Sequence, residues 1–227
     1  MAQMKTPGVY IIEKNAFPNS VVEVATAIPA FIGHTQFARD GNKDLTDIPF
    51  RISSMAEFHS FFGFAPTLRF GIRPEDSESE DTTNDINVLF PDGSCQLTLP
   101  KTFYALYYNM LLFYANGGGP CYIVSVGDYE HDFKSIDFTN ALLALKKEQE
   151  PTLVVVPEAV YMEEGDCYKV QTAALMHCGN DMKNRFAILD VFNGYKDENG
   201  AVIKSFRENI GSNFLAYCAS YYPWINT

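Results

Sequence analysis

The sequence predicts an α/β domain with three layers, a largely parallel sheet, an extended N-terminal arm and a small β-hairpin insertion. Continuous apolar runs such as residues 153–156 are typical of strands that are covered on both faces. Segments of helical periodicity separate these runs by about 10–15 residues, as right-handed βαβ crossovers require. Glycine or proline ends several of the segments, so the boundaries can be placed.

Composition limits the classes of partner. The chain has 227 residues, of which 47% are hydrophobic, and this excludes disorder for most of it. Its 17 basic and 28 acidic residues give a net charge of −11, so we expect no nucleic-acid partner. No apolar run approaches the roughly 20 residues that span a bilayer, so we expect no direct membrane insertion. The five cysteines include no CxxC pair and are expected to be free thiols in a reducing compartment.

Residues 1–20 are predicted to be an extended arm. A short strand-like run, which cannot form a core by itself, lies between two prolines: Val9, Tyr10, Ile11 and Ile12. Such a segment is either unattached or pairs with a sheet edge, its own or a neighbour's. These four residues are our candidate inter-subunit contact.

The core domain is predicted to comprise residues 21–64 and 103–227. It begins with a buried strand at 28–33 and a helix at 54–62. Residues 65–102 are predicted to be an insertion. Within it, residues 74–85 carry six carboxylates and no base, which is typical of a solvated loop, and 86–99 reads as a hairpin.

Helices and strands then alternate. We expect Thr102 to cap a helix that runs to Tyr114, with Asn116 and Gly117 as its C-terminal stop, and a strand at 121–126 to follow. The remaining predicted elements are helices at 138–147, 168–178 and 206–218 and strands at 152–156 and 186–189. The aromatic residues at 221–224 could form a core-closing strand or an exposed contact.

Two groups of residues could carry chemistry. Gly117, Gly118 and Gly119 lie between a helix and a strand, the reverse of a phosphate-binding loop, so they are predicted to form a helix stop and a turn. Asp128, Glu158 and Asp190 follow three predicted strands at the edge where α/β sheets bind ligands. These carboxylates could hold Mg²⁺, although loop and capping roles are more common for such positions.

Other reactive residues form no recognisable catalytic pattern. The histidines at 34, 59, 131 and 177 are scattered, and no HExxH or GxSxG motif occurs. His177 and Cys178 are adjacent in a predicted helix, so they point about 100° apart. Arg185 is expected at the surface or in a partner contact. We therefore expect no catalytic residues, cofactor or resident metal, and no enzymatic activity.

Several blocks in order resemble the sheath subunits of contractile phage tails and related contractile injection systems. The blocks are Thr6-Pro7-Gly8-Val9-Tyr10 and residues 20–33 (SVVEVATAIPAFIG), 51–63 (RISSMAEFHSFFG), 113–126 (FYANGGGPCYIVSV), 151–160 (PTLVVVPEAV), 185–191 (RFAILDV) and 219–224 (ASYYPW). The resemblance implies a structural protein that surrounds an inner tube. It implies arms that exchange strands between subunits and a change of subunit packing on contraction. It also implies other sheath subunits, the inner tube and the baseplate as partners.

The resemblance further implies assembly in the bacterial cytoplasm and incorporation into a phage tail or a tail-like particle. Members of the family usually continue beyond the block at 219–224, whereas this sequence stops at Thr227. We therefore expect this chain alone to be mostly monomeric and the intact gene product to polymerise. The alternatives are a metal-dependent hydrolase or phosphatase that uses Asp128, Glu158 and Asp190, and a monomeric binding module.

Overall fold

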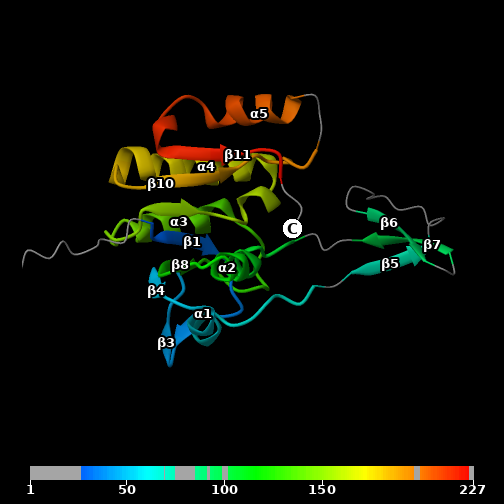
Figure 1. Ribbon diagram of the computed structural model, residues 1–227, viewed down its shortest axis with the longest axis horizontal. Helices are drawn as coiled ribbons and strands as arrows, with labels where there is room; N and C mark the ends of the chain where they lie inside the picture. The colour runs from blue at the N-terminus through cyan, green and yellow to red at the C-terminus, as the bar shows by residue number, and fades with distance from the viewer. Residues whose placement is uncertain are drawn as a thin grey trace, which may run out of the picture.

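A six-stranded, mostly parallel sheet forms the centre of the structure (Figure 1). The computed structural model describes residues 27–68, 70–74, 85–90, 93–98, 102–196 and 200–224. Five neighbouring strands are parallel, and the last strand, at one edge, is antiparallel. In spatial order the strands are β11 (Cys218–Tyr221), β10 (Phe186–Asp190), β9 (Leu153–Val155), β1 (Pro29–Gly33), β8 (Cys121–Ser125) and β4 (Phe50–Ile52).

The central strands are covered on both faces because alternate residues enter two different cores. Ala30 and Ile32 belong to one buried cluster, while Phe31 belongs to the other. The same alternation separates Val124 from Ile123 on β8. The prediction that the continuous apolar runs form strands covered on both faces is therefore confirmed. The arrangement is compatible with a three-layer α/β domain.

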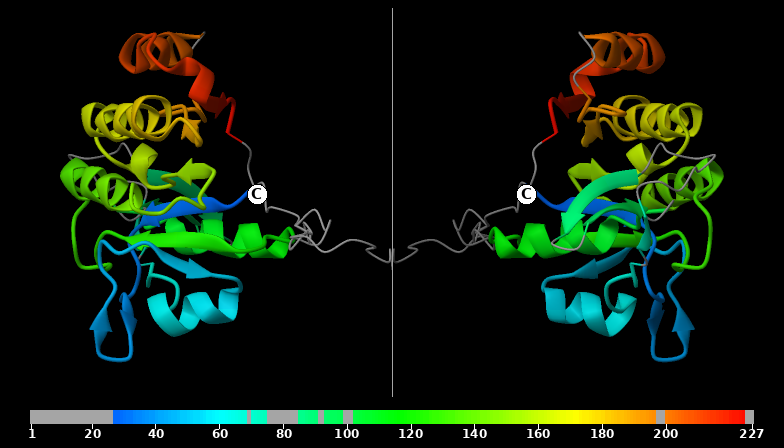
Figure 2. Two further views of the ribbon diagram at one scale, coloured as in Figure 1. Left: turned by 90° about the vertical axis from the view of Figure 1, so that its left-hand side faces the viewer. Right: turned by 90° about the vertical axis from the view of Figure 1, so that its right-hand side faces the viewer.

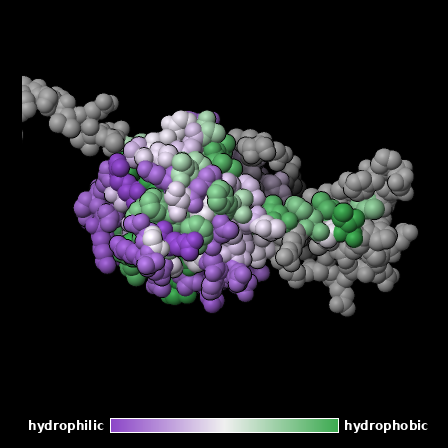
Figure 3. Space-filling model, turned by 90° about the horizontal axis from the view of Figure 1, so that it is seen from below, coloured by the Kyte–Doolittle hydropathy of each residue, from purple (hydrophilic) through white to green (hydrophobic). Residues whose placement is uncertain are grey.

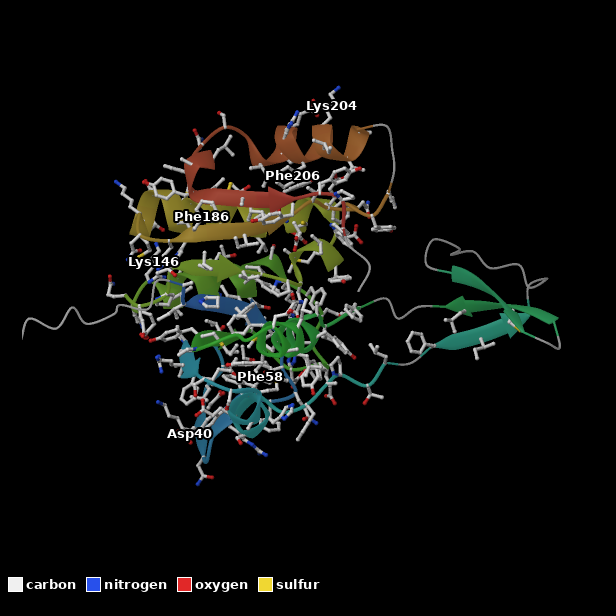
Figure 4. The ribbon with its side chains drawn as sticks, in the orientation of Figure 1. Asp40, Phe58, Lys146, Phe186, Lys204 and Phe206 are labelled. Atoms are coloured by element: carbon white, nitrogen blue, oxygen red, sulfur yellow. The ribbon has the colours of Figure 1, made fainter. Side chains whose placement is uncertain are left out.

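Helices α3 (Ser135–Leu145) and α4 (Glu164–Met176) cover one face of the sheet (Figure 2). The predicted apolar face of α3 is confirmed, since Phe138, Ala141, Leu142 and Leu145 are all buried. Helix α5 (Ala201–Ile210) packs beside α4. Figure 4 shows Phe206 pointing from α5 toward the sheet and Lys204 pointing away from it.

Helices α1 (Met55–Phe62) and α2 (Leu106–Ala115) pack on the opposite face, where Phe58 is fully buried. Helix α1 begins as predicted, because the Ser54 hydroxyl accepts a hydrogen bond from the Glu57 amide. Helix α2 begins four residues after Thr102, at Leu106, and has no side-chain cap of its own. Thr102 is therefore not its cap.

Two helix predictions need correction toward the C-terminus. Helix α4 begins at Glu164, earlier than predicted, and continues past Gly179 as the π-helical turn η2 (His177–Met182). The helix predicted at 206–218 instead ends at Ile210, because Gly211 adopts a positive φ of 73°. A short 3₁₀ turn η3 (Leu215–Tyr217) follows, and residues 218–221 form strand β11.

A separate three-stranded antiparallel sheet lies away from the main sheet in Figure 1. It contains β5 (Gly71–Pro74), β7 (Gly93–Thr98) and β6 (Asp85–Phe90), so the predicted hairpin is present with an added strand. Figure 3 shows hydrophobic residues gathered toward this sheet, where Phe70 and Ile72 are exposed. The acidic run at 75–84 lies outside the described residues, and the division into arm, core and insertion remains a prediction.

A small two-stranded hairpin also projects from the body, formed by β2 (Arg39–Asp40) and β3 (Lys43–Asp44) (Figure 4). Both strands are exposed. The hairpin precedes β4 and takes no part in the main sheet.

Candidate functional site

The carboxyl edge of the parallel strands is the place where an α/β sheet would bind a ligand. The chain leaves β1 toward helices on one face and leaves β9 toward α4 on the other face. Neighbouring connections that diverge in this way leave a crevice between the two strands.

A buried pair of side chains occupies this crevice. The Glu158 carboxylate is fully buried. One of its oxygens, Oε2, accepts a hydrogen bond from the backbone amide of His34 at 2.9 Å and lies 2.8 Å from His34 Nδ1. Its other oxygen accepts a hydrogen bond from the Leu106 amide at 3.3 Å. Glu158 therefore connects the ends of β1 and β9 to the first turn of α2, where a negative charge also interacts favourably with the helix dipole.

The surroundings of this pair are largely aromatic. The His34 ring, which is 1% exposed, lies 5.0 to 5.7 Å from the rings of Tyr104, Phe133 and Phe138. Burial raises the pKa of Glu158, while its hydrogen bonds from His34 oppose that rise. The crevice is thus filled by the protein's own side chains, and no open carboxylate is available there.

The other two candidate carboxylates lie in different surroundings. Asp128 follows β8 with 42% of its side chain exposed, and it accepts hydrogen bonds from the Glu130 amide and from His131. The hydrogen bond from the Glu130 amide lowers the pKa of Asp128. Asp190 ends β10, and burial raises its pKa.

These three carboxylates do not form a metal site in the described structure. Across the described ranges, no group of three or more His, Cys, Asp or Glu side chains could hold a metal ion. The sequence correctly placed Asp128, Glu158 and Asp190 at strand ends. It did not indicate that both oxygens of Glu158 are already occupied.

Arg185 was expected at the surface or in a partner contact, and this expectation was wrong because its side chain is buried. It is 2% exposed, and its guanidinium binds the carbonyls of Leu145 and Glu148 and lies 2.9 Å from His177 Nε2. Burial and the nearby Arg185 charge lower the pKa of His177 to about 4. This cluster ties the C-terminal end of α3 to η2, and burial raises the pKa of the adjacent Cys178 thiol to about 12.

The glycine loop is a helix stop, as predicted. Helix α2 ends at Ala115, and Gly117 adopts a φ of 82°. The Gly118 amide donates to the Phe113 carbonyl at 2.9 Å, which closes the turn before β8 begins at Cys121.

The two edges of the main sheet differ in how they are protected. Edge strand β4 carries Arg51, whose Nε lies 3.1 Å from a Glu150 oxygen. Edge strand β11 contains no charge or proline, and its last two residues are exposed. In the part of the chain that the structure describes, β11 pairs only with β10. An edge of this kind can accept an added strand.

Sequence reasoning did not identify this edge. Gly211, which lies inside the helix predicted at 206–218, was the available signal that the helix ends early. The candidate arm residues Val9, Tyr10, Ile11 and Ile12 lie outside the described residues, so their role as a contact remains a prediction.

Comparison with known proteins gave no assignment: no protein-family model and no curated protein matches this sequence. Among the helices that the structure describes, none has the length and apolar character needed to cross a membrane.

Proposed function

We propose that this chain is a structural subunit, or the N-terminal portion of one, of a contractile sheath around the inner tube of a phage tail or related injection system. Its fold would be a three-layer α/β domain with an extended arm and a hairpin insertion. Subunits polymerise through strand exchange by the arms at residues 1–20 and change their packing on contraction. The ordered blocks of resemblance support this proposal.

The observation that carries the proposal is the unprotected edge strand β11. It presents four residues without a charge, and the run at residues 9–12 is also four residues long. Main-chain hydrogen bonds along an added strand hold two chains together without requiring a particular side chain. An arm that needs a sheet edge is complementary to an edge that has no second neighbouring strand among the described residues.

The filled crevice between β1 and β9 also supports a structural role. Ligand sites in open α/β sheets usually lie there, yet Glu158 and His34 are buried and hydrogen bonded to each other. Domains joined by exchanged strands can rotate between two packings, and such a role requires no ligand in the crevice.

The proposal is tested by expressing the intact gene product together with its inner tube protein and viewing the product by negative-stain microscopy. We expect cylinders or extended polymers, and deletion of residues 9–12 should abolish them while leaving the thermal midpoint of unfolding nearly unchanged. If only monomers form in the presence of tubes, the proposal is wrong. Metal-dependent turnover of a phosphoester that is lost in Asp190→Ala would instead establish the hydrolase alternative.

A further inference from the structure

A hollow of about 410 Å³ lies on the α2 side of the main sheet, at the carboxyl ends of β10 and β11. It exists because the helices cover the sheet unevenly. Helix α2 packs over β1 and β8 (Figure 1), and among the described residues no member of β10 or β11 belongs to the buried cluster beneath α1 and α2. The volume is in the range of pockets that bind small ligands. The walls are mostly apolar and include Leu112, Val160, Tyr161, Asp190 and Trp224.

The Trp224 indole forms a fixed aromatic wall of the hollow. Its Nε1 donates a hydrogen bond to the Val191 carbonyl at 3.0 Å, and the Trp224 backbone amide donates to the Gly194 carbonyl at 3.2 Å. The Tyr161 ring lies beside the indole, with the two centroids 6.4 Å apart and the ring planes tilted by 56°. Because the polar group of the indole is already hydrogen bonded, Trp224 offers a ligand only its aromatic surface.

Asp190 brings a negative charge into this hollow. Ala187 and Leu189 of β10 enter the buried cluster under α3 and α4, so the alternation of the strand turns Asp190 to the opposite face, where α2 lies. Gln171 donates a hydrogen bond to the Asp190 backbone carbonyl at 2.7 Å, but no described residue donates one to the Asp190 carboxylate. Burial raises the pKa of Asp190, and no positive charge among the described residues opposes that rise. Burial and, to a smaller extent, the Asp190 charge raise the pKa of Tyr161, so the carboxylate and this ring are neighbours.

One carboxylate among aromatic and aliphatic walls selects a particular class of cation. A divalent metal ion requires several oxygen ligands, and across the described ranges no group of three or more His, Cys, Asp or Glu side chains could hold one. A primary ammonium or a guanidinium brings several N–H donors, and mostly apolar walls would leave part of them unpaired. A quaternary ammonium has no N–H donor, and both aromatic faces and a carboxylate attract its charge.

We propose that this hollow binds a soluble molecule that carries a quaternary ammonium group, with the cation against the rings of Trp224 and Tyr161 and beside the Asp190 carboxylate. Leu112 and Val160 provide aliphatic surface for its methyl groups. A lipid headgroup of the same chemistry is less suitable, because its phosphate would approach the Asp190 carboxylate. This binding site does not depend on the proposed sheath assembly.

The test is a titration of the full chain with choline chloride, at an ionic strength held constant with sodium chloride. The one tryptophan of the chain lies in the wall of the hollow, so its fluorescence reports occupancy. We expect a saturable change in emission and saturation transfer from the protein to the choline methyl groups by NMR. The neutral molecule of the same shape, 3,3-dimethylbutan-1-ol, should bind at least about tenfold more weakly. Magnesium chloride and phosphatidylcholine vesicles should leave the emission unchanged.

Variants locate the site. Asp190→Asn and Tyr161→Leu should each weaken choline binding by about five- to tenfold, because they remove the charge and the aromatic face. Asp128→Asn is the matched control: it removes a carboxylate that follows a neighbouring part of the same sheet, is 42% exposed and does not line the hollow, so binding should be unchanged. Circular dichroism and urea unfolding establish that each variant is folded, and Tyr161→Leu decides the matter if Asp190→Asn does not fold.

Each of the following results overturns the proposal. The absence of both the emission change and the saturation transfer means that no site exists. Equal affinity for choline and its neutral analogue means that the hollow is only an apolar surface. Binding that survives in the folded Asp190→Asn and Tyr161→Leu variants lies elsewhere. Binding to the vesicles alone means that the partner is a lipid surface and not a soluble molecule.

Discussion

Replacing Glu158 with alanine should destabilise the protein more than any change to an exposed carboxylate at the same sheet edge. The replacement removes the acceptor of three interactions: 2.9 Å from the His34 amide, 2.8 Å from His34 Nδ1 and 3.3 Å from the Leu106 amide. The donors lie in a fully buried region, where each unsatisfied donor costs about 1–3 kcal/mol.

The summed cost of the three unsatisfied donors is an upper bound on the loss of unfolding free energy. The Leu106 bond is long, and water can enter the space that the side chain leaves. We therefore expect the free energy of unfolding to fall by about 3–5 kcal/mol, as when one partner of a buried pair is removed. For a chain of this size that loss lowers the thermal midpoint by about 6–20 °C.

The measurement is urea unfolding at pH 7, followed by the fluorescence of Trp224, the one tryptophan of the chain, and by circular dichroism. Asp128→Ala is the matched control, because this carboxylate has 42% of its side chain exposed and should cost less than about 1 kcal/mol. If Glu158→Ala costs no more than the control, the crevice does not stabilise the fold and our reasoning is wrong.

Three further predictions concern other buried groups. Because burial lowers the pKa of His177 to about 4, the folded state binds fewer protons than the unfolded state between that value and 6.5. The protein should therefore lose about 3 kcal/mol of unfolding free energy as pH falls through this window, and urea titrations of His177→Gln should show a shallower loss. Gly179→Ala should cost about 1–3 kcal/mol, since the new Cβ would lie 2.4 Å from Phe214 Cβ. By contrast, Gly165→Ala in α4, where the added Cβ meets open space, should stabilise the protein by about 0.5–1 kcal/mol. Thermal melts of both glycine variants measure these two effects. Finally, iodoacetamide should modify three thiols only after unfolding, as mass spectrometry can count, because burial raises their pKa values to about 11 or 12: Cys121, Cys167 and Cys178.

The sequence predicted the central strands well because their apolar runs are local signals. Strands β1, β8 and β9 lie within the predicted segments, and β10 extends one residue beyond its segment, to Asp190. The parallel pairing follows from the helices between the strands. The start of α2 was wrong for a physical reason. Glu158, which is 52 residues away along the chain, satisfies the first amide of the helix, so no local cap is required.

The candidate site depends on contacts that a single sequence does not encode locally. The sequence placed Glu158 at the correct sheet edge, but its partner His34 lies 124 residues away. Similarly, Arg185 is charged and borders a strand, and only the surrounding carbonyls of Leu145 and Glu148 explain its burial. Strand β11 has only four residues and mixes apolar with polar side chains, so its sequence shows no clear strand periodicity. Pairing with β10 determines its conformation.

The unequal edges of the main sheet have a consequence for the symmetry of any assembly. Among the described residues β11 has a neighbouring strand on one side only, whereas β4 at the opposite edge carries the Arg51–Glu150 pair. Contact through β11 therefore uses one surface on the receiving copy and a different surface on the donating copy, which is a head-to-tail arrangement. Repetition of such a contact produces either a closed ring or an open helix whose two ends differ. A two-fold symmetric dimer, by contrast, would use the same surface on both copies and could not extend through that contact.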